Sequence, residues 1–378
     1  MTLDPATYSP APAWAGTCGP RDAKVVIVGE AWGENEDLLR SPFVGWSGYE
    51  LSRMMYEAEL CSEPPLKQEQ YSSLMLLDWW KRSGLLLTNT FSFRPPQNKI
   101  DFICGKKAEV GSNYSHPPIG SREGYVLPQY LAELQRLKEE LSAYDRNVVV
   151  ALGAKASWAL LNSEKISKIR GVTTESTLCP GLKVIPTYHP AGIMRNWSWR
   201  AIAIADLMKA KRQSAFPEIH RPACKILVNP TILDVRAWLR RPMFEIGVDL
   251  ETKARMIEMV GIAVSPLEAI AIPFLDKSKP DGNYWSAVDE REVWSLLRWR
   301  LEDPAITKVF QNGLYDLQYF IRRSPIRPRN CSEDTMLLHH SMFPESQKGL
   351  GFLGSIYTDH ASWKLWRGKE AEELKRDE

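Results

Sequence analysis

The sequence contains no C-x-x-C pair, although six cysteines occur in its 378 residues. Isolated cysteines offer neither the paired spacing of a zinc site nor the framework of a small disulfide-rich fold. We therefore expect reduced thiols in a reducing compartment. The positions are Cys18, Cys61, Cys104, Cys179, Cys224 and Cys331.

The chain also lacks an apolar run of the ~18 residues that a membrane-spanning helix needs. Its first residues, MTLDPATYSPAPAWAG, are proline-rich and show no basic-then-apolar pattern, so we expect no signal peptide and a cytoplasmic protein. A charge imbalance is absent too, because 48 basic and 46 acidic residues leave a net charge of +2. Any surface that binds nucleic acid must therefore be local.

Short apolar runs alternate with helical patterns over the first half of the chain. Runs such as KVVIVGE, LLLTNTF and NVVVALG are separated by patterns such as LPQYLAELQRLKEEL. This alternation predicts an α/β domain with a mainly parallel sheet over residues 1–215, carrying a long surface insertion at 104–128. We place a linker at residues 216–223, where two prolines interrupt the helical pattern.

Residues 224–378 follow a different pattern. Three successive strands, FEIGVDLET, MIEMVGIAVSP and EAIAIPF, precede alternating helices and strands. This order predicts a second, α+β domain with a mixed sheet.

Polar residues follow three of the expected strands in the first domain. Glu30 lies in GEAWGENE after the first strand, Asn89 ends the second, and His189 follows a later one. Ligands of parallel α/β sheets bind at the carboxyl ends of the strands, so these residues are candidates for one site.

Four segments in this order resemble the uracil-DNA glycosylase superfamily, in particular its iron–sulfur thermophile-type branch. They are GEAWGENED at 29–37, SPFVGWSG at 41–48, TNTFSFRPPQNK at 88–99 and TYHPAGIMR at 187–195. The resemblance covers about the first 210 residues. It implies a uracil-DNA-glycosylase-like parallel-sheet α/β/α fold and uracil-containing DNA as partner.

The resemblance also implies roles for individual residues. Glu30 would stabilise the cationic sugar or orient water, while Glu36 is a weaker alternative that a helix start alone would explain. Phe43 would stack on the extruded base, Asn89 would read the uracil edge, and His189 would donate to the uracil oxygen. Taken singly, each has a structural alternative: a core aromatic, a turn cap and a structural histidine.

Residues 192–195 would form the wedge that fills the gap left in the duplex.

Two departures from the family pattern stand out. Trp32 occupies the position of the family's proline, and Ser92 stands where the iron–sulfur branch has a cysteine before R-P-P. No amino-terminal C-x-x-C occurs, so we predict that no iron–sulfur cluster is bound. The domain would then be either a catalyst or a module that only binds uracil or another modified base.

The second domain resembles the 3′→5′ proofreading exonuclease of family A DNA polymerases, particularly phage enzymes. VDLET at 248–252 matches the first exonuclease motif, and FQNGLYDLQYF at 310–320 matches the second. The resemblance implies a ribonuclease-H-like mixed-sheet fold. It also implies Mg²⁺ or Mn²⁺ held by Asp249, Glu251 and Asp316, with Asn312 touching substrate.

Two geometric expectations accompany this assignment. Because Asp249 and Glu251 alternate along a strand, we expect one to act from a strand end where the chain twists toward the other. Asp316 is expected to share a helix face with Asn312, four residues earlier.

The family's third motif, Y-x-x-x-D, is missing, since Tyr357 is followed four positions later by Ala361. The chain would then be either the amino-terminal product of a split polymerase gene, completed by a separate polymerase chain, or a truncated form that lacks one metal ligand. Its location would be the cytoplasm of a bacterium or of a phage-infected host.

The sequence thus predicts a DNA replication or repair enzyme with glycosylase and exonuclease modules. The alternative is a non-catalytic module that binds a modified base and tethers a replication complex. A dinucleotide-binding oxidoreductase is disfavoured because G-x-G-x-x-G is absent.

Overall fold

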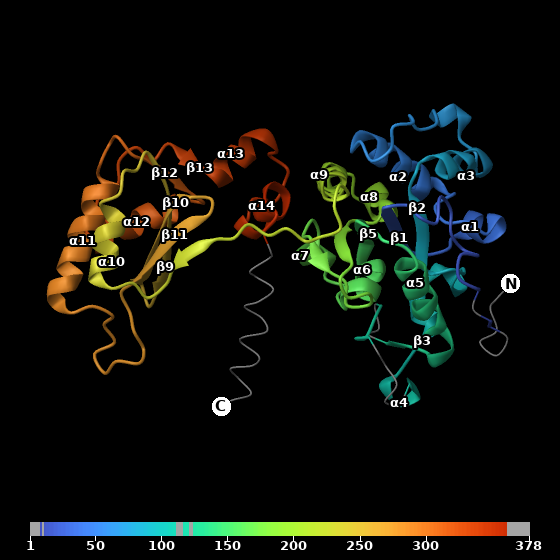
Figure 1. The fold of residues 1–378 in the computed structure, drawn as a ribbon, viewed down its shortest axis with the longest axis horizontal. Helices are drawn as coiled ribbons and strands as arrows, with labels where there is room; N and C mark the ends of the chain where they lie inside the picture. Colours follow the sequence, from blue (N-terminus) through green and yellow to red (C-terminus); the bar gives the residue numbers. More distant parts are fainter. Residues whose placement is uncertain (1–7, 10, 111–115, 121–123, 361–378) are drawn as a thin grey trace. The chain divides into compact units, whose positions relative to one another are not determined.

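The computed structural model describes residues 8–9, 11–110, 116–120 and 124–360, which form two compact units. Unit 1 combines Met1–Arg221 with Gly351–Glu378, and unit 2 is Pro222–Leu350 (Figure 1). In the described residues, no helix is both long and apolar enough to cross a membrane.

Unit 1 is built on a sheet with the strand order β2-β1-β5-β7-β6. Its first four strands are parallel, and the short β6 pairs antiparallel with β7. The apolar runs of the sequence form these strands because helices cover both faces of a parallel sheet and leave no polar side. The strands are β1 (Val25–Ala31), β2 (Leu86–Phe91), β5 (Val148–Leu152), β6 (Thr174–Glu175) and β7 (Lys183–Thr187).

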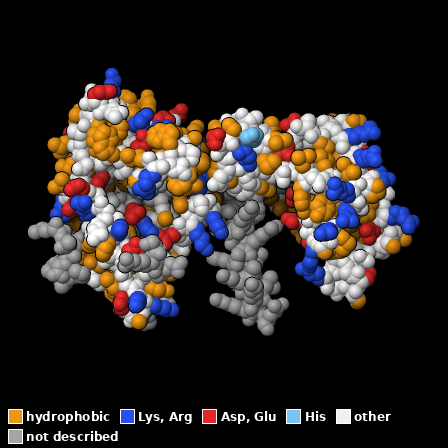
Figure 2. Space-filling view, turned by 180° about the vertical axis from the view of Figure 1, so that it is seen from behind, with side chains coloured by type: hydrophobic (Ala, Val, Ile, Leu, Met, Phe, Trp, Pro, Cys, Tyr) orange, Lys and Arg blue, Asp and Glu red, His pale blue; other side chains and the backbone are white. Residues whose placement is uncertain are grey.

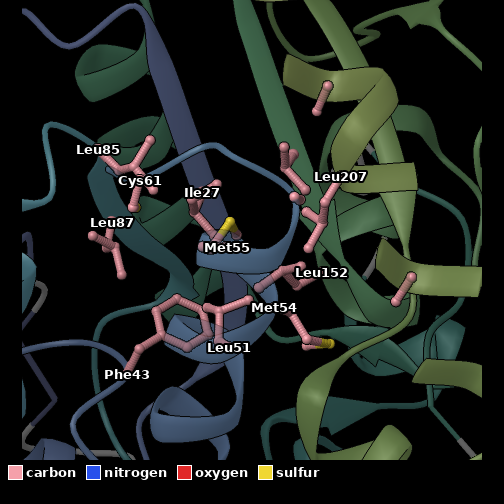
Figure 3. Close-up of a cluster of buried hydrophobic side chains, with 14 of the residues drawn as sticks. Ile27, Phe43, Leu51, Met54, Met55, Cys61, Leu85, Leu87, Leu152 and Leu207 are labelled. Carbon is pink, nitrogen blue, oxygen red and sulfur yellow. The ribbon is translucent and has the colours of Figure 1, made fainter. Parts of the chain in front are cut away.

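Helices pack on both faces of this sheet, which gives the predicted α/β/α layers (Figure 1). One core contains Ile27, Leu87 and Val150 together with residues of α2, α3 and α9, and Figure 3 shows part of it. The other core contains Val26 and Val149 with residues of α5 and α6. The helices are α1 (Glu34–Leu39), α2 (Trp46–Glu57), α3 (Ser73–Arg82), α5 (Ala132–Ser142), α6 (Gly153–Leu161), α7 (Ile166–Ile169), α8 (Pro190–Arg195) and α9 (Trp199–Gln213).

The predicted insertion contains a small antiparallel pair of strands. β3 (Cys104–Gly105) pairs with β4 (Tyr125–Val126), and α4 (Lys107–Val110) lies between them in the sequence. Residues 111–115 and 121–123 of this insertion lie outside the described part. Short 3₁₀ turns complete unit 1 at Gln68–Gln70, Pro96–Asn98, Ile100–Ile103 and Pro128–Tyr130.

A buried arginine ties α5 to the outer strand β2. The Arg136 side chain is 3% exposed, and its guanidinium donates to the main-chain carbonyls of Asn89 (2.6 Å) and Thr90 (3.2 Å). Its other nitrogens pair with Glu133 (3.0 Å) and Glu140 (2.7 Å). These contacts satisfy carbonyls at the end of β2 that no neighbouring strand reaches, and they hold α5 against the sheet.

Unit 2 contains a sheet with the order β13-β12-β9-β10-β11-β8. β9, β10 and β11 are antiparallel neighbours, while β12 is parallel to β9. This is the predicted ribonuclease-H-like mixed sheet. Its strands are β8 (Lys225–Leu227), β9 (Glu245–Lys253), β10 (Met256–Ser265), β11 (Glu268–Pro273), β12 (Thr307–Phe310) and β13 (Glu333–Asp334).

Helices α10, α11 and α13 of unit 2 begin at polar side chains that accept from free main-chain amides. Thr231 caps α10, Ser286 caps α11 and Asp334 caps α13. Figure 2 shows many Lys and Arg side chains on the visible face of this unit, at the right of the view. The helices are α10 (Ile232–Leu239), α11 (Ala287–Leu301), α12 (Leu314–Arg323) and α13 (Thr335–Met342).

The carboxyl-terminal helix α14 (Leu350–Tyr357) departs from the predicted domain plan. The second domain was expected to extend to residue 378, but α14 packs on unit 1. Lys209 Nζ donates to the carbonyls of Gly171 and Thr358, both at 2.8 Å, and Arg170 donates to Ser355 Oγ at 3.0 Å. Lys209 also donates to the Ser355 carbonyl, so the two buried cations hold the last turn of the helix, a contact that sequence periodicity does not reveal.

We predict that Arg136→Met lowers the free energy of unfolding of unit 1 by about 3–5 kcal/mol, because it leaves two buried carboxylates without a cationic partner. Denaturant unfolding followed by tryptophan fluorescence measures this loss. Lys138→Met, at an exposed position of the same helix, is the control and should change the value by less than about 0.5 kcal/mol. Equal losses in both variants would show that the network is not stabilising.

Candidate functional sites

Gly29 allows the first site to assemble at the carboxyl ends of β1 and β2. It pairs in register with Asn89 on the neighbouring parallel strand. A Cβ atom at position 29 would overlap both Oδ1 of Asn89 and the ring of Phe43. Only glycine therefore lets the amide and the aromatic ring meet over the end of β1.

Asn89 is 2% exposed, and its backbone is held by the contact of Arg136 with its carbonyl. Within the described parts of the chain, no protein group hydrogen-bonds its side-chain amide. The amide donor and acceptor thus remain available to a ligand, with their position set by β2 and α5.

Phe43 lies in a left-handed backbone conformation, with φ of 56°. Trp80 Nε1 donates to its carbonyl at 2.9 Å, and Gly48 permits close approach of α2 to the same carbonyl. The ring is 4% exposed and packs beside Leu51 in the core (Figure 3). Its centroid is 6.3 Å from that of the His189 ring, so Phe43 is both a core residue and a wall of the site.

Glu36, the alternative to Glu30, is a structural brace. Its carboxylate accepts from the amides of Gly45 (2.8 Å) and Gly33 (3.2 Å), and the side chain is buried. It therefore closes the first turn of α1 and holds the loop that carries Phe43.

Glu30 is half-buried near the end of β1. Burial raises the pKa of its carboxyl, and the positive charges of Lys155 and Arg195 partly offset this effect. Lys155 is itself paired with Glu164, which also accepts from the Gly120 amide at 3.1 Å. Sequence patterns did not single out Lys155; its place two residues after the glycine that begins α6 was the available signal.

His189 is held as a neutral donor at the amino end of α8. Its Nδ1 accepts from the Ala191 amide at 3.2 Å, so in the neutral ring Nε2 carries the proton. Desolvation, reinforced by the charge of Arg195, lowers the pKa of His189 to about 4. A neutral Nε2–H can stabilise a developing negative charge on a ligand oxygen.

The wedge predicted at residues 192–195 divides into buried and exposed parts. Ile193 is fully buried, whereas Met194 is half exposed. Trp197, which was not predicted, is 56% exposed, and the guanidinium of Arg200 lies 5.2 Å from its ring. The exposed tip of this connection is therefore aromatic as well as aliphatic.

Ser92, at the position where the iron–sulfur branch has a cysteine, is held by protein contacts. The Ser92 amide donates to Glu133 at 2.8 Å, and next to it the rings of Tyr8, Phe93 and Tyr130 pack at centroid distances of 4.8–5.5 Å. In the part of the chain that the structure describes, no three His, Cys, Asp or Glu side chains converge closely enough to hold a metal.

In unit 2, Asp249 and Glu251 lie on the same face of β9. The buried residues of this strand are Ile246, Val248 and Leu250, so the odd positions face away from the core. The expectation that strand twist must bring Asp249 and Glu251 together was wrong, because residues two apart on a strand share a side.

Asp316 is buried at the start of α12, where Oδ1 accepts from the Leu250 amide at 2.9 Å. Burial, with the negative charges of Asp249 and Asp334 adding to it, raises the pKa of Asp316 to about 6. The carboxylates of Asp249 and Asp334 are thus close enough to Asp316 to affect its pKa.

We predicted that Asn312 and Asp316 share a helix face, and this prediction was wrong. It precedes α12 in a left-handed conformation with φ of 62°, and Gly313 caps the helix. The carboxylate of Asp334, which sequence reasoning missed, accepts from the amides of Asn312 (3.1 Å) and Gly313 (2.8 Å). Asp334 therefore positions this turn while capping α13; the signal was its place before a helical run.

The carboxylates of unit 2 do not complete a two-metal centre. Among the described residues of unit 2, no three His, Cys, Asp or Glu side chains converge closely enough to hold a metal ion. Hard oxygen ligands suit Mg²⁺ or Mn²⁺, but Asp249, Glu251 and Asp316 alone leave the ligand set unfinished. Tyr357, in the stretch expected to approach the third motif, belongs to unit 1, and Ala361 lies outside the described residues.

The lowered pKa of His189 leads us to predict how the free energy of unfolding changes with pH. Between pH 6.5 and about 4 the unfolded chain binds a proton that the folded ring refuses, so stability falls as the pH falls through this window. The share of His189 is at most about 1.4 kcal/mol per pH unit. Unfolding at several pH values should show a shallower loss for His189→Asn, which retains a good helix cap. Equal slopes would contradict a depressed pKa.

Solved structures that resemble part of the chain include RNase D of Escherichia coli and NrnC of Brucella melitensis. RNase D is 20% identical with a TM-score of 0.26, over 36% of this chain and 34% of that chain. NrnC is 17% identical with a TM-score of 0.25, over 37% of this chain and 62% of that chain. This chain thus spans about a third of the length of RNase D.

The amino-terminal half is similar to curated glycosylases. The type-4 uracil-DNA glycosylase of Thermotoga maritima is 29% identical over 197 residues, which are 51% of this chain and 79% of that protein. That of Saccharolobus solfataricus is 26% identical over 199 residues, or 51% and 72%. The family model of the uracil DNA glycosylase superfamily matches residues 15–215, a range that includes Glu30, Asn89 and His189. The chain therefore belongs to the uracil DNA glycosylase superfamily.

Proposed function

We propose that unit 1 hydrolyses the N-glycosidic bond between uracil and deoxyribose in DNA. The observation that carries this proposal is the state of His189, a neutral imidazole whose Nδ1 is occupied by the Ala191 amide and whose Nε2–H remains as a donor. Such a donor stabilises the uracil oxygen as the base leaves as an anion. The relatives named type-4 uracil-DNA glycosylases support the choice of base.

Asn89 would select the base. Uracil presents a carbonyl acceptor beside an N–H donor, and a fixed amide can match both, whereas cytosine presents the reverse pattern. The contact of Arg136 with the Asn89 carbonyl fixes the strand that carries this amide. Phe43 would supply the stacking surface for the extruded base.

Glu30 would act on the sugar side of the bond. The reaction develops positive charge on the sugar, and a carboxylate in a partly desolvated place stabilises that charge strongly. Lys155 and Arg195 favour the ionised form of Glu30 in spite of its burial. Because these groups act without a metal, the reaction should proceed in EDTA.

The alternative function is a module that binds uracil or another modified base without cleaving it. Trp32 is the feature that favours this alternative, since it is buried beside the site loop in place of the family's proline, with its amide bonded to the Phe93 carbonyl at 3.1 Å. Tight binding of uracil-containing DNA with no base release would establish this alternative.

We predict that Glu30→Gln slows uracil release from DNA by about 100-fold or more, the scale of losing one strong electrostatic contact to the transition state. Alkali-labile breaks in a 5′-labelled oligonucleotide, measured in EDTA, report the rate. Glu34→Gln is the matched control, because Glu34 is an exposed carboxylate at the start of α1, four residues after Glu30. An unchanged rate for Glu30→Gln beside an active wild type would remove Glu30 from the mechanism.

For unit 2 we propose a second function, a metal-dependent 3′→5′ exonuclease related to the proofreading domain of family A polymerases. The supporting observation is that Asp316 accepts from the Leu250 amide, next to Asp249 on β9, while burial and, after it, the charge of Asp249 raise the pKa of Asp316. Perturbed carboxylates in such a cluster are typical of functional sites. The phage-like polymerase context rests on the motifs at 248–252 and 310–320.

We propose that another chain completes this site. A separately encoded polymerase chain with a Y-x-x-x-D segment would supply the missing carboxylate, because the described residues offer no third motif next to Asp249 and Asp316. The site of the isolated chain would then bind one of the two ions poorly, and transition-state stabilisation would fall by several kcal/mol.

We predict that the purified chain digests single-stranded DNA weakly in Mn²⁺ and that adding the polymerase chain raises the rate. Asp249→Ala should remove this gain, while Asp281→Ala, at an exposed loop position, should retain it. Gel analysis of 5′-labelled DNA measures both. Robust digestion by the chain alone, abolished by Asp249→Ala, would show that the site is complete and would sink the proposal of a shared site.

A further inference from the structure

Unit 2 carries a hollow of about 580 Å³ between α11, the end of α12 and the start of β10. Its lining includes Arg291, Arg298, Arg323, Trp294 and Phe274. The rings of Trp294 and Phe274 stack at a centroid distance of 4.1 Å with an interplanar angle of 16°. The hollow therefore combines guanidinium groups with a rigid aromatic surface.

The arginines of this hollow carry largely uncompensated charge. In the described part of the chain, Arg291 and Arg323 form no ion pair. Glu290, an acidic residue of the lining, accepts from the Trp294 indole at 3.1 Å, which fixes the orientation of the ring. Arg298 donates to the Pro325 carbonyl at 3.0 Å and lies 4.0 Å from the carboxylate of Glu302, so its position is fixed and its charge is partly balanced. The charge of Arg291 and Arg323, which is not balanced in this way, is suited to a polyanion.

A second hollow, of about 410 Å³, neighbours the first, since Arg323 lines both. It adds Arg255, Arg322 and Tyr319 to the lining. Its remaining aromatic residue, Tyr315, bonds through its hydroxyl to Thr252 at 2.5 Å.

The second hollow lies on elements that also carry the carboxylates. Thr252 directly follows Glu251 on β9, and Tyr315 directly precedes Asp316 on α12. The two hollows thus offer a path lined by arginines, whose second part lies on the helix that carries Asp316.

We propose that this path, which we call the arginine trough, binds single-stranded nucleic acid on its way to the carboxylate site. Arginines at intervals would hold successive phosphates, and Trp294 and Tyr319 would stack bases without reading their sequence. The aromatic surfaces favour nucleic acid over an acidic peptide, whose side chains have no planar bases to stack. This inference rests on the proposed role of unit 2 in handling a DNA strand.

The test compares the binding of short and longer thymidine strands, of about four and about twelve nucleotides, by the full-length chain. Uracil is left out of the strands so that base recognition by unit 1 is not engaged, and EDTA prevents hydrolysis. Fluorescence anisotropy measures each dissociation constant at several salt concentrations. The variants are Arg291→Glu/Arg323→Glu and, as control, Arg329→Glu, which reverses an exposed charge of unit 2 outside both hollows.

The wild type should bind the longer strand more tightly than the short one. The ratio of the two dissociation constants should fall by at least about tenfold in the double variant. Reversing two phosphate contacts should also reduce the salt slope by about 1.4. Arg329→Glu should behave as the wild type. Trp294→Leu, an apolar replacement, should weaken binding of the longer strand by at least about fivefold while leaving the salt slope unchanged.

An unchanged length preference in the double variant would overturn the proposal. If the double variant loses binding to a polyglutamate peptide but retains thymidine binding, the trough binds an acidic protein instead, and the proposal is also overturned.

The binding result does not depend on cleavage. If the chain never digests DNA, with or without a partner chain, the exonuclease function is refuted. The binding measurements would still show whether the arginine trough binds single-stranded DNA.

Discussion

The guanidinium of Arg136 is the contact on which the organisation of unit 1 depends. Strand β2 is at the end of the sheet order, and near the carboxyl end of this strand the carbonyls of Asn89 and Thr90 both accept from Arg136. A buried cation reaches both, and two buried carboxylates of α5 balance its charge. Because the strand end carries Asn89, the same interaction that holds α5 against the sheet also positions the amide that we propose reads the base.

Both units place their polar site residues where apolar elements end. In unit 1, Glu30 and His189 stand at or just beyond the carboxyl ends of buried strands. In unit 2, Asp316 begins a helix whose amino end meets β9, and Asp334 holds the intervening turn. A packed core fixes these ends, while the side chains remain free of core packing. Pre-organisation of this kind makes a neutral histidine or a crowded carboxylate tolerable.

Much of this arrangement follows from local sequence patterns. Continuous β-branched runs marked the parallel strands because burial on both sides removes the need for polar residues, and the motifs around Asn89 and His189 marked the site. Local sequence patterns did not predict contacts between segments that are far apart in the sequence. Nothing near Asp334 shows that its carboxylate accepts from the turn at Asn312, and nothing in α14 shows that Lys209 binds its last carbonyls.

Composition and periodicity thus predicted an α/β unit followed by an α+β unit, since hydrophobic spacing is a property of neighbouring residues, and the family motifs nominated Glu30, Asn89, His189, Asp249 and Asp316 as candidates. Three-dimensional packing alone established that Gly29 admits the Asn89 amide, that Nδ1 of His189 is occupied, and that α14 lies on unit 1. Each of these depends on which atoms meet across long sequence separations. Desolvation and hydrogen-bond geometry are set at those meetings, and no local pattern records them.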